Sequence, residues 1–278
     1  MSGKLYIVGT PIGNMGDMSP RGIEVLSGVD FIAAEDTRVS LKLLNKFNIK
    51  KPLVSCHEHN IKERSEQITE RIIAGESCAV VTDAGMPCIS DPGEELVRSC
   101  AEKGIEVCVI PGACAAIAAL AVSGLATAKF CFEGFLNSDG KLRRDRLKEL
   151  EYEKRTMIFY MPPHKMLEML KDMEKAFGDR KISISREITK IHEEVIRTTL
   201  KKAIERYVGE NPRGEYVIVV EGAKDKMPTE ELDFDSAVKL VKERIEAGVG
   251  ASAAAKEVAE LSEGKFRKSE LYSAAVKK

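Results

Sequence analysis

The sequence has no tryptophan and only four histidines, and aromatic residues make up 5% of its 278 positions. So little aromatic surface argues against a broad platform on which nucleic-acid bases could stack. No apolar run approaches the roughly 18–20 uninterrupted residues of a membrane-spanning helix, which excludes a membrane protein. The 43 lysines and arginines nearly cancel the 44 acidic residues. Any contact with nucleic acid must therefore come from local basic clusters rather than from the net charge.

The seven cysteines are not arranged as a metal site or as a redox motif. None forms a C-x-x-C pair, and no histidine is spaced from a cysteine as in a zinc site. The opening residues, MSGKLYIVG, lack the basic start and long apolar stretch of a secretory signal. We therefore expect a cytoplasmic protein with reduced thiols and no bound metal.

The first half of the chain alternates short apolar runs with helical segments. The runs lie at 5–10, 29–35, 52–56, 78–83 and 106–112. Ser19 followed by Pro20 predicts the start of one intervening helix, and Asn60 predicts the start of another. This alternation is typical of βαβ units, so we expect a mostly parallel sheet that is buried on both faces.

The second half has a different pattern of strands. Its apolar runs lie at 130–136, 156–162, 181–188, 193–199 and 215–222. A turn sequence at 211–214 favours antiparallel pairing in this half. The alanine-rich segment 113–123 predicts a helix between the halves and marks a domain boundary.

After residue 222 the composition becomes polar, and the remaining sequence predicts helices without strands. These helices are expected at 235–247, 251–261 and 267–276, at helix-turn-helix spacing. The fold class is thus α/β, with domains at 1–115 and 116–225 and a small helical domain at 229–278. The basic end of this last domain indicates either a docking element for nucleic acid or a solvated tail.

Five loops follow predicted strands, where open α/β sheets bind their ligands. They are 9–14, 35–38, 57–60, 82–93 and 110–116. The first does not fit G-x-G-x-x-G, so a tight turn explains it as well as a phosphate site does. The loop 82–93 is the most informative, because its twelve residues are rich in glycine and proline and are shaped to wrap a ligand before a helix that is expected to begin at Pro92. The small residues of 110–116 allow close approach of either a ligand or the sheet.

The two remaining loops carry charged and imidazole side chains. In 35–38, Asp36 or Thr37 can cap the helix that follows, whereas Arg38 is a candidate functional cation. In 57–60, two histidines lack a third ligand, which favours a polar loop facing substrate over a metal site.

Taken together, several segments resemble the tetrapyrrole-methylase superfamily over nearly the full length. They are VGTPIGN, EDTR, HEHN, DAGMPCISDPG, PGACAAIAALAVSGL, REITKIHEE and GEYVIVVEG. The resemblance implies two α/β domains with S-adenosylmethionine in the cleft between them, followed by a small helical domain. By motif position, the cofactor would contact Pro11, Asp83, Ala84, Gly85, Ile89, Cys114, Ala115 and Met161.

The resemblance also implies an activity, which is methyl transfer to the ribose 2′-oxygen of a cytidine in the decoding region of small-subunit (16S) rRNA. The partners would be this rRNA or the small ribosomal subunit, and a second copy of the chain in a homodimer. The substrate-binding candidates are Arg143, Arg144, Arg186, Lys190, Lys265, Arg267 and Lys268. The basic run at 141–146 and the run at 186–193 could also be solvated surfaces.

A ribose hydroxyl is a poor nucleophile, so the enzyme must orient it and assist loss of its proton. Glu187 or His192 could act as the base, and Lys190 could lower the pKa of the hydroxyl. These three residues and Arg38 are the catalytic candidates. Two other readings are a small-molecule methylase of the same fold, which would not need the basic tail, and a non-catalytic RNA-binding or ribosome-assembly module, which would not bind the methyl donor.

Overall fold

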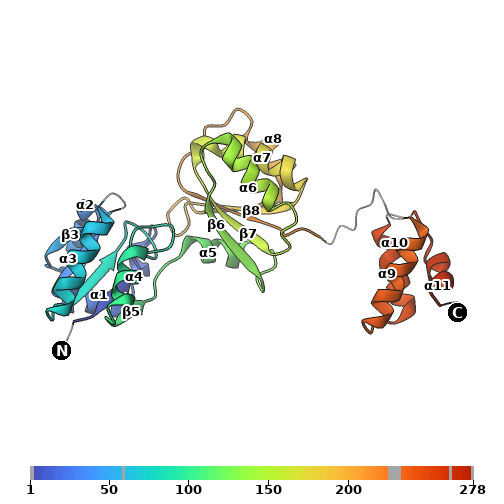
Figure 1. The fold of residues 1–278 in the computed structure, drawn as a ribbon. Coiled ribbons are helices and arrows are strands. Elements are labelled where there is room, and N and C mark those ends of the chain that lie inside the picture. The colour runs from blue at the N-terminus through green and yellow to red at the C-terminus, as the bar shows by residue number, and fades with distance from the viewer. Residues whose placement is uncertain (1–2, 58–59, 225–232, 263–264, 277–278) are drawn as a thin grey trace. The chain divides into compact units, whose positions relative to one another are not determined.

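The computed structural model describes residues 3–57, 60–224, 233–262 and 265–276. Contacts divide the chain into two compact units, Met1–Gly222 and Ala223–Lys278, which we call the two-sheet unit and the C-terminal unit. Figure 1 shows the elements of both in chain order. No helix in the described part of the chain is long and apolar enough to cross a membrane. The domain boundary expected at residue 115 stays a prediction.

The first sheet has five parallel strands in the order β3-β2-β4-β1-β5. Its strands are β1 (Leu5–Val8), β2 (Phe31–Ala34), β3 (Leu53–Ser55), β4 (Cys78–Val81) and β5 (Val107–Ile110). All five were expected from the apolar runs. Because the strands are parallel, their carboxyl ends lie along one edge, where the loops after them meet.

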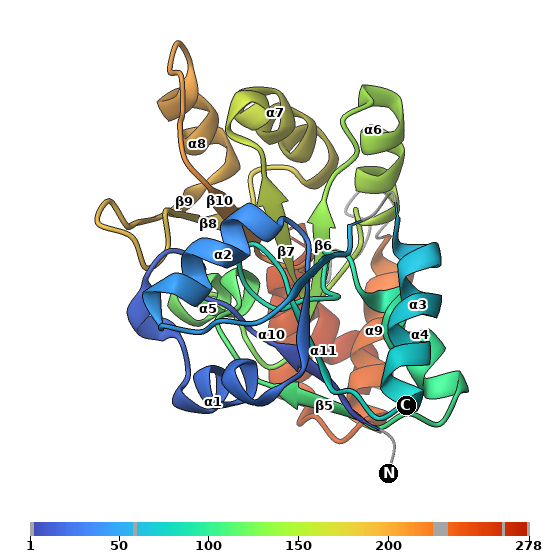
Figure 2. The same ribbon diagram turned by 90° about the vertical axis from the view of Figure 1, so that its left-hand side faces the viewer.

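Helices cover both faces of this sheet. They are α1 (Pro20–Gly28), α2 (Thr37–Lys46), α3 (Ile61–Ile73) and α4 (Glu94–Glu102). Leu26 of α1 and Leu44 of α2 pack on one face, and Ile68 of α3 and Leu96 of α4 pack on the other. Figure 2 shows α3 and α4 side by side. Alternate residues of each strand therefore enter separate cores, which explains why the strands read as continuous apolar runs.

The second sheet is mixed, with strand order β6-β7-β10-β8-β9. Its strands are β6 (Phe130–Phe135), β7 (Thr156–Met161), β8 (Lys181–Arg186), β9 (Glu194–Thr199) and β10 (Tyr216–Val220). β6 and β7 are parallel and the other pairs are antiparallel, as the turn sequence at 211–214 predicted.

Helices also cover the second sheet. They are α5 (Ala115–Val122), α6 (Gly140–Glu149), α7 (Met166–Phe177) and α8 (Leu200–Tyr207). The last three cover one face, and α5 packs on the other face against Ile158, Val217 and Val219. The small alanines of α5 allow this close packing. The expected helix between the halves therefore packs on the second sheet.

The C-terminal unit contains α9 (Phe234–Glu246), α10 (Ala251–Leu261) and α11 (Lys268–Val276), close to the expected bounds. It has a small core of its own, built from Ala237, Val241, Ala254, Ala255, Val258 and Leu271. Burial of this core stabilises the packing of the three helices against one another. The linker expected after Gly222 lies mostly outside the described residues.

Two local expectations need correction. The side chain of Asn60 makes no cap hydrogen bond to α3, because its Oδ1 instead accepts one from the backbone N–H of His57 at 2.9 Å. The helix expected to begin at Pro92 begins at Glu94, after Gly93 adopts φ +128°. By contrast, the Ser19 side chain caps α1 as expected, accepting from the backbone N–H of Gly22 at 3.0 Å.

Candidate functional site

A cavity of about 490 Å³ lies between the two sheets. The loops after β1, β2, β4 and β5 line it from the first sheet, so it opens at the carboxyl ends of the parallel strands. Its volume is within the range of pockets that hold small organic ligands, about 300–1,000 Å³. The loop 82–93 contributes the largest share of this wall, as its length and composition indicated.

The second sheet supplies a wall that is largely aromatic and apolar. Phe135, Tyr160, Met161 and Ile188 line this side. The rings of Phe135 and Tyr160 lie 5.2 Å apart, which fixes both against each other. Burial raises the pKa of Tyr160 to about 12, so its phenol stays neutral near pH 7. A planar ligand group can stack on this wall.

Backbone hydrogen bonds and close packing join the loops of the first sheet into one continuous surface. The N–H of Thr10 donates to the carbonyl of Gly85 at 2.9 Å, and the N–H of Gly85 donates back at 3.2 Å. A Cβ on Gly112 would lie 2.7 Å from the Cα of Gly9, so only glycine permits this contact. The loops after β1, β4 and β5 therefore form a preorganised wall.

Backbone strain is concentrated around the cavity. Among the described residues, five that are not glycine have positive φ, and four of these lie in two loops beside the cavity. Cys88 and Ser90 adopt φ 72° and 59° in the loop 82–93, and Glu187 and Thr189 adopt φ 50° and 67° after β8. Such conformations persist only where the surrounding structure holds them, and they cluster at functional sites.

Three carboxyl groups line the first-sheet side of the cavity, on Glu35, Asp83 and Asp91. Burial, reinforced by the charge of Glu35, raises the pKa of Asp91 to about 6. The same two causes raise the pKa of Asp83. The hydroxyl of Thr82 donates to Oε2 of Glu35 at 2.7 Å and holds that carboxylate in place. Crowded carboxylates of this kind favour a ligand that carries positive charge.

Most residues expected to bind a cofactor lie together in this cavity. Its lining includes Asp83, Ala84, Gly85, Ile89, Cys114, Ala115 and Met161. Pro11 is not among the described residues that line the cavity, although its neighbour Ile12 is. The predicted residues from three separate segments thus share one concave surface, and their binding role remains a proposal.

The expected catalytic residues Glu187 and Lys190 lie beside the cavity rather than in its lining. Lys190 Nζ donates to Glu187 Oε1 at 2.9 Å and to Glu215 Oε2 at 2.8 Å. Burial would lower the pKa of Lys190, but its two carboxylate partners outweigh this effect and raise it. The hydrogen bond from Lys190 lowers the pKa of Glu187, which makes Glu187 a weak base. Since Glu215 lines the cavity, the pair holds a cavity wall in place.

Arg38 and His192, also expected to be catalytic, lie outside the cavity lining, and their catalytic roles stay predictions. The Arg38 side chain is 87% exposed and pairs with Asp36 at 2.6 Å, the residue that caps α2. His192 is exposed in the turn before β9. Within the described chain, neither residue lines the cavity.

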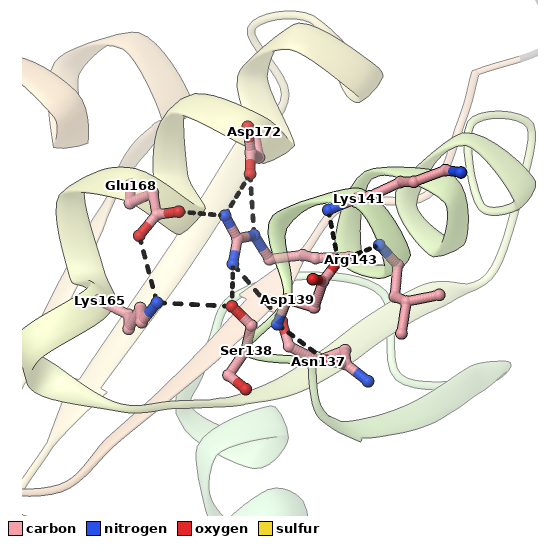
Figure 3. A network of polar contacts seen from close by, with 9 residues as sticks. Asn137, Ser138, Asp139, Lys141, Arg143, Lys165, Glu168 and Asp172 are labelled. Carbon is pink, nitrogen blue, oxygen red and sulfur yellow. Dashed lines mark hydrogen bonds and ion pairs between the residues drawn. The ribbon is translucent and has the colours of Figure 1, made fainter.

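Arg143 was expected to bind substrate, and the structure contradicts this expectation. Its side chain is fully buried and pairs with Glu168 at 2.5 Å and with Asp172 at 2.7 Å. Figure 3 shows these ion pairs, together with contacts from Arg143 to the carbonyls of Asn137 and Ser138. A guanidinium bound on all sides by the protein has no donor left for a phosphate.

The other substrate-binding candidates stay predictions. Arg144 is exposed on α6. Arg186 lines a separate hollow at the end of β8. Lys265, Arg267 and Lys268 belong to the C-terminal unit, where all three are exposed. In the segment 57–60, the second histidine lies outside the described residues.

Four acidic or imidazole side chains that line the cavity were not among the residues expected from the sequence, namely those of Glu35, Asp91, His164 and Glu215. Glu35 and Asp91 belong to loops that were selected, but their carboxylates could equally have been helix caps. His164 follows Pro162 and Pro163 after β7, and this position at a strand end is the signal that could have identified it.

A stacking wall, crowded carboxylates and a preorganised loop surface define the class, an α/β protein whose cavity between two sheets suits a small cationic organic ligand. Comparisons with known proteins narrow this class. A model of the family of tetrapyrrole (corrin/porphyrin) methylases matches residues 4–204. The chain belongs to this family.

Individual relatives and a solved structure agree with this assignment. The chain is 49% identical over 222 residues to a Synechocystis protein named ribosomal RNA small subunit methyltransferase I, covering 80% of each chain. A protein of the same name from Halalkalibacterium halodurans is 46% identical over 259 residues, covering 92% of this chain and 90% of that protein. A uroporphyrin-III C-methyl transferase from Thermus thermophilus, solved with S-adenyl homocysteine, shares the fold at a TM-score of 0.57 and 19% identity. The match covers 78% of this chain and 97% of that one.

Proposed function

We propose that this protein transfers a methyl group from S-adenosylmethionine to small-subunit ribosomal RNA. The acceptor in this proposal is the ribose 2′-oxygen of a cytidine in the decoding region. The observation that carries the proposal is the 49% identity to a relative named for methylation of this RNA, in a chain whose family loops line one cavity. The identity extends over 80% of both chains, so it includes both sheets.

The residues around the cavity fit S-adenosylmethionine. The aromatic wall of Phe135 and Tyr160 offers a stacking surface for a purine. Asp83 and Asp91 offer negative charge to the sulfonium and the amino group. Ala84, Gly85 and Ala115 have small side chains that let a ligand reach the backbone.

When bound, the cofactor supplies a methyl group on a positively charged sulfur, which a nucleophile can displace in line. The protein must hold the ribose hydroxyl close to this methyl group and accept its proton. Orientation of this kind contributes about 7–11 kcal/mol to lowering a barrier. The strained loops 82–93 and 187–193 supply fixed surfaces for it, because the backbone of Gly85 is hydrogen-bonded to Thr10 and the backbone of Glu187 to Glu215.

His164 is the proton acceptor in this proposal. It lines the cavity from the second sheet, opposite the carboxylates of the first sheet, and a neutral imidazole nitrogen can accept a proton from a hydroxyl. Glu187 and Lys190 act as positioning residues, because their hydrogen bonds hold the segment that carries Glu215.

The C-terminal unit serves as a docking element for the RNA in this proposal. Lys265, Arg267 and Lys268 are exposed and lie within four residues, which gives this unit a cluster of positive charge. We further propose a homodimer, and light scattering should then report about twice the chain mass of 30.6 kDa. A mass of one chain at micromolar concentration would contradict the dimer.

The proposal is tested by offering labelled S-adenosylmethionine together with three acceptors in parallel, namely small ribosomal subunits, their deproteinised rRNA and a tetrapyrrole. Label should enter an RNA-containing acceptor and not the tetrapyrrole. The variant His164→Gln should lower turnover while leaving the affinity for S-adenosylmethionine, measured by calorimetry, within about twofold. Transfer to the tetrapyrrole alone would reject the proposal, and full turnover in the variant would reject the role of His164.

A further inference from the structure

A second hollow, of about 410 Å³, opens at the end of the second sheet where β10 begins. Three arginines line it, Arg186, Arg206 and Arg213, and we call it the arginine hollow. Its remaining lining includes Tyr207, Tyr216 and Asn211. The three arginines come from three segments of the chain, which is why the sequence did not reveal the site.

The fold holds this hollow in a fixed form. Arg186 at the end of β8 pairs in register with Tyr216 of β10 and with Glu194 of β9, so the three residues lie side by side across the sheet. The rings of Tyr207 and Tyr216 meet edge to face at 6.5 Å and form a buried floor. A tyrosine phenol is neutral near pH 7, and burial raises the pKa of Tyr207 further, to about 12, so this floor adds no negative charge.

Among the residues that the structure describes, two of the three guanidinium groups have no carboxylate partner. Arg206 pairs with Glu194 at 3.1 Å. The Nε of Arg186 donates only to the backbone carbonyl of Arg213, at 3.1 Å. Within the described chain, Arg186 and Arg213 make no ion pair with a carboxylate. Glu210 also lies at the hollow, so the three arginines face two acidic residues there. Positive charge is left over for an anion, and planar guanidinium groups suit a phosphate.

The arginine hollow adjoins the cavity, because Tyr216 lines both. The opposite wall of the cavity carries the carboxylates of Glu35, Asp83 and Asp91. A polyanion is repelled from that wall but attracted to the hollow. An RNA strand with one ribose in the cavity can therefore continue past Tyr216 toward the arginines.

We propose that the arginine hollow binds a backbone phosphate of the RNA strand, next to the nucleotide whose ribose enters the cavity. This inference rests on the proposed function, because it takes RNA as the substrate. Arg186 and Arg213 supply the phosphate contacts, and Tyr216 separates the phosphate from the reacting ribose.

The test is the double variant Arg186→Gln with Arg213→Gln, compared with the control Arg155→Gln. Arg155 is an exposed arginine next to the first residue of β7, at the end of the second sheet away from the cavity. Kinetics of methyl transfer to small-subunit rRNA are measured over a range of salt concentrations. Loss of charged hydrogen bonds to a phosphate should raise KM for RNA about tenfold or more with kcat within about twofold. The logarithmic salt slope should become shallower by about 0.7–0.9, the value for one phosphate.

The control should keep the wild-type KM and salt slope, and all variants should keep the wild-type affinity for S-adenosylmethionine. Equal KM and salt slope in the double variant and the control would overturn the inference while leaving the proposed function intact. If the wild type transfers no methyl group to RNA, the proposed function fails. Equilibrium RNA binding by the same variants then tests separately whether the arginine hollow binds a phosphate. An unchanged salt slope in the double variant would overturn this inference, and a shallower slope would support it.

Discussion

Replacing the buried Arg143 should destabilise the protein much more than replacing its exposed neighbour Arg144. The Arg143 guanidinium holds Asp172 through Nε and Nη2, and it contacts the carbonyls of Asn137 and Ser138 (Figure 3). Methionine has a similar length and no charge, so Arg143→Met removes these contacts without emptying the space.

The magnitude follows from what Arg143→Met leaves behind. Breaking a buried ion pair by removing one partner costs about 3–5 kcal/mol. The Glu168 side chain is 53% exposed, so water can solvate it, whereas Asp172 is only 16% exposed and remains nearly buried without a partner. We therefore expect the lower end of this range, a loss of about 3 kcal/mol in the free energy of unfolding. Arg144→Met should stay within about 0.5 kcal/mol of wild type, because Arg144 is exposed.

Urea denaturation followed by circular dichroism measures both variants. A second substitution supplies the control, since Arg143→Met combined with Asp172→Leu removes the stranded carboxylate and should recover part of the lost stability. A loss below about 1 kcal/mol for Arg143→Met, or an equal loss for Arg144→Met, would refute the buried ion-pair account.

Four further predictions concern the cavity and the C-terminal unit. Because the pKa of Asp91 is raised from 3.8 to about 6, the stability of the ligand-free protein should fall as pH rises through this interval. The affinity for cationic S-adenosylmethionine should rise between about pH 5 and 7 as Asp91 ionises. Calorimetry should show that this affinity depends less on pH in Asp91→Asn. The same pH dependence in the variant and the wild type would show that the cation does not bind beside Asp91. Gly85→Val should weaken the affinity for S-adenosylmethionine more than tenfold, while the protein still unfolds cooperatively. The control Gly178→Val changes a glycine at a similar positive φ in open space and should keep the wild-type affinity. Equal affinities in the two variants would show that Gly85 does not contact the cofactor. Deleting residues 229–278 should raise KM for RNA and leave the affinity for the methyl donor intact, and a kinetically silent deletion would remove the docking role.

The strands and several of the helices were predictable, because apolar runs and helix-boundary residues report local structure directly. All ten strands of the two sheets were expected from runs of apolar residues. The loops that line the cavity were predictable for a related reason, since ligands bind where parallel strands end. The loop 82–93 could thus be selected from its place after a strand, whereas Ala84 and Gly85 within it were singled out by the family resemblance.

Long-range pairing was not predictable in the same way. The run KLRRDR contains Arg143 and Arg144 side by side, and nothing local says which of them faces α7. The partners of Arg143, Glu168 and Asp172, lie 25 and 29 residues further along the chain. Burial of one arginine and exposure of the next follow from how α6 packs against α7, which composition does not report.

The catalytic candidates after β8 show the same limit. Lys190 was expected at the reaction centre, but its ammonium group is held between Glu187 and Glu215. Glu215 comes from the loop before β10, and only the antiparallel pairing of β8 with β10 brings it near. The sequence identified the correct neighbourhood without identifying which side chains face the cavity.

The most direct test of the proposed function is the identity of the methylated nucleoside. Small-subunit rRNA without the modification is incubated with the protein and methyl-labelled S-adenosylmethionine, digested to nucleosides and analysed by mass spectrometry, with fragment mapping to locate the position. The account predicts that the label appears as 2′-O-methylcytidine at a single position in the decoding region. Label on a base, on the ribose of another nucleotide or on no RNA at all would contradict it.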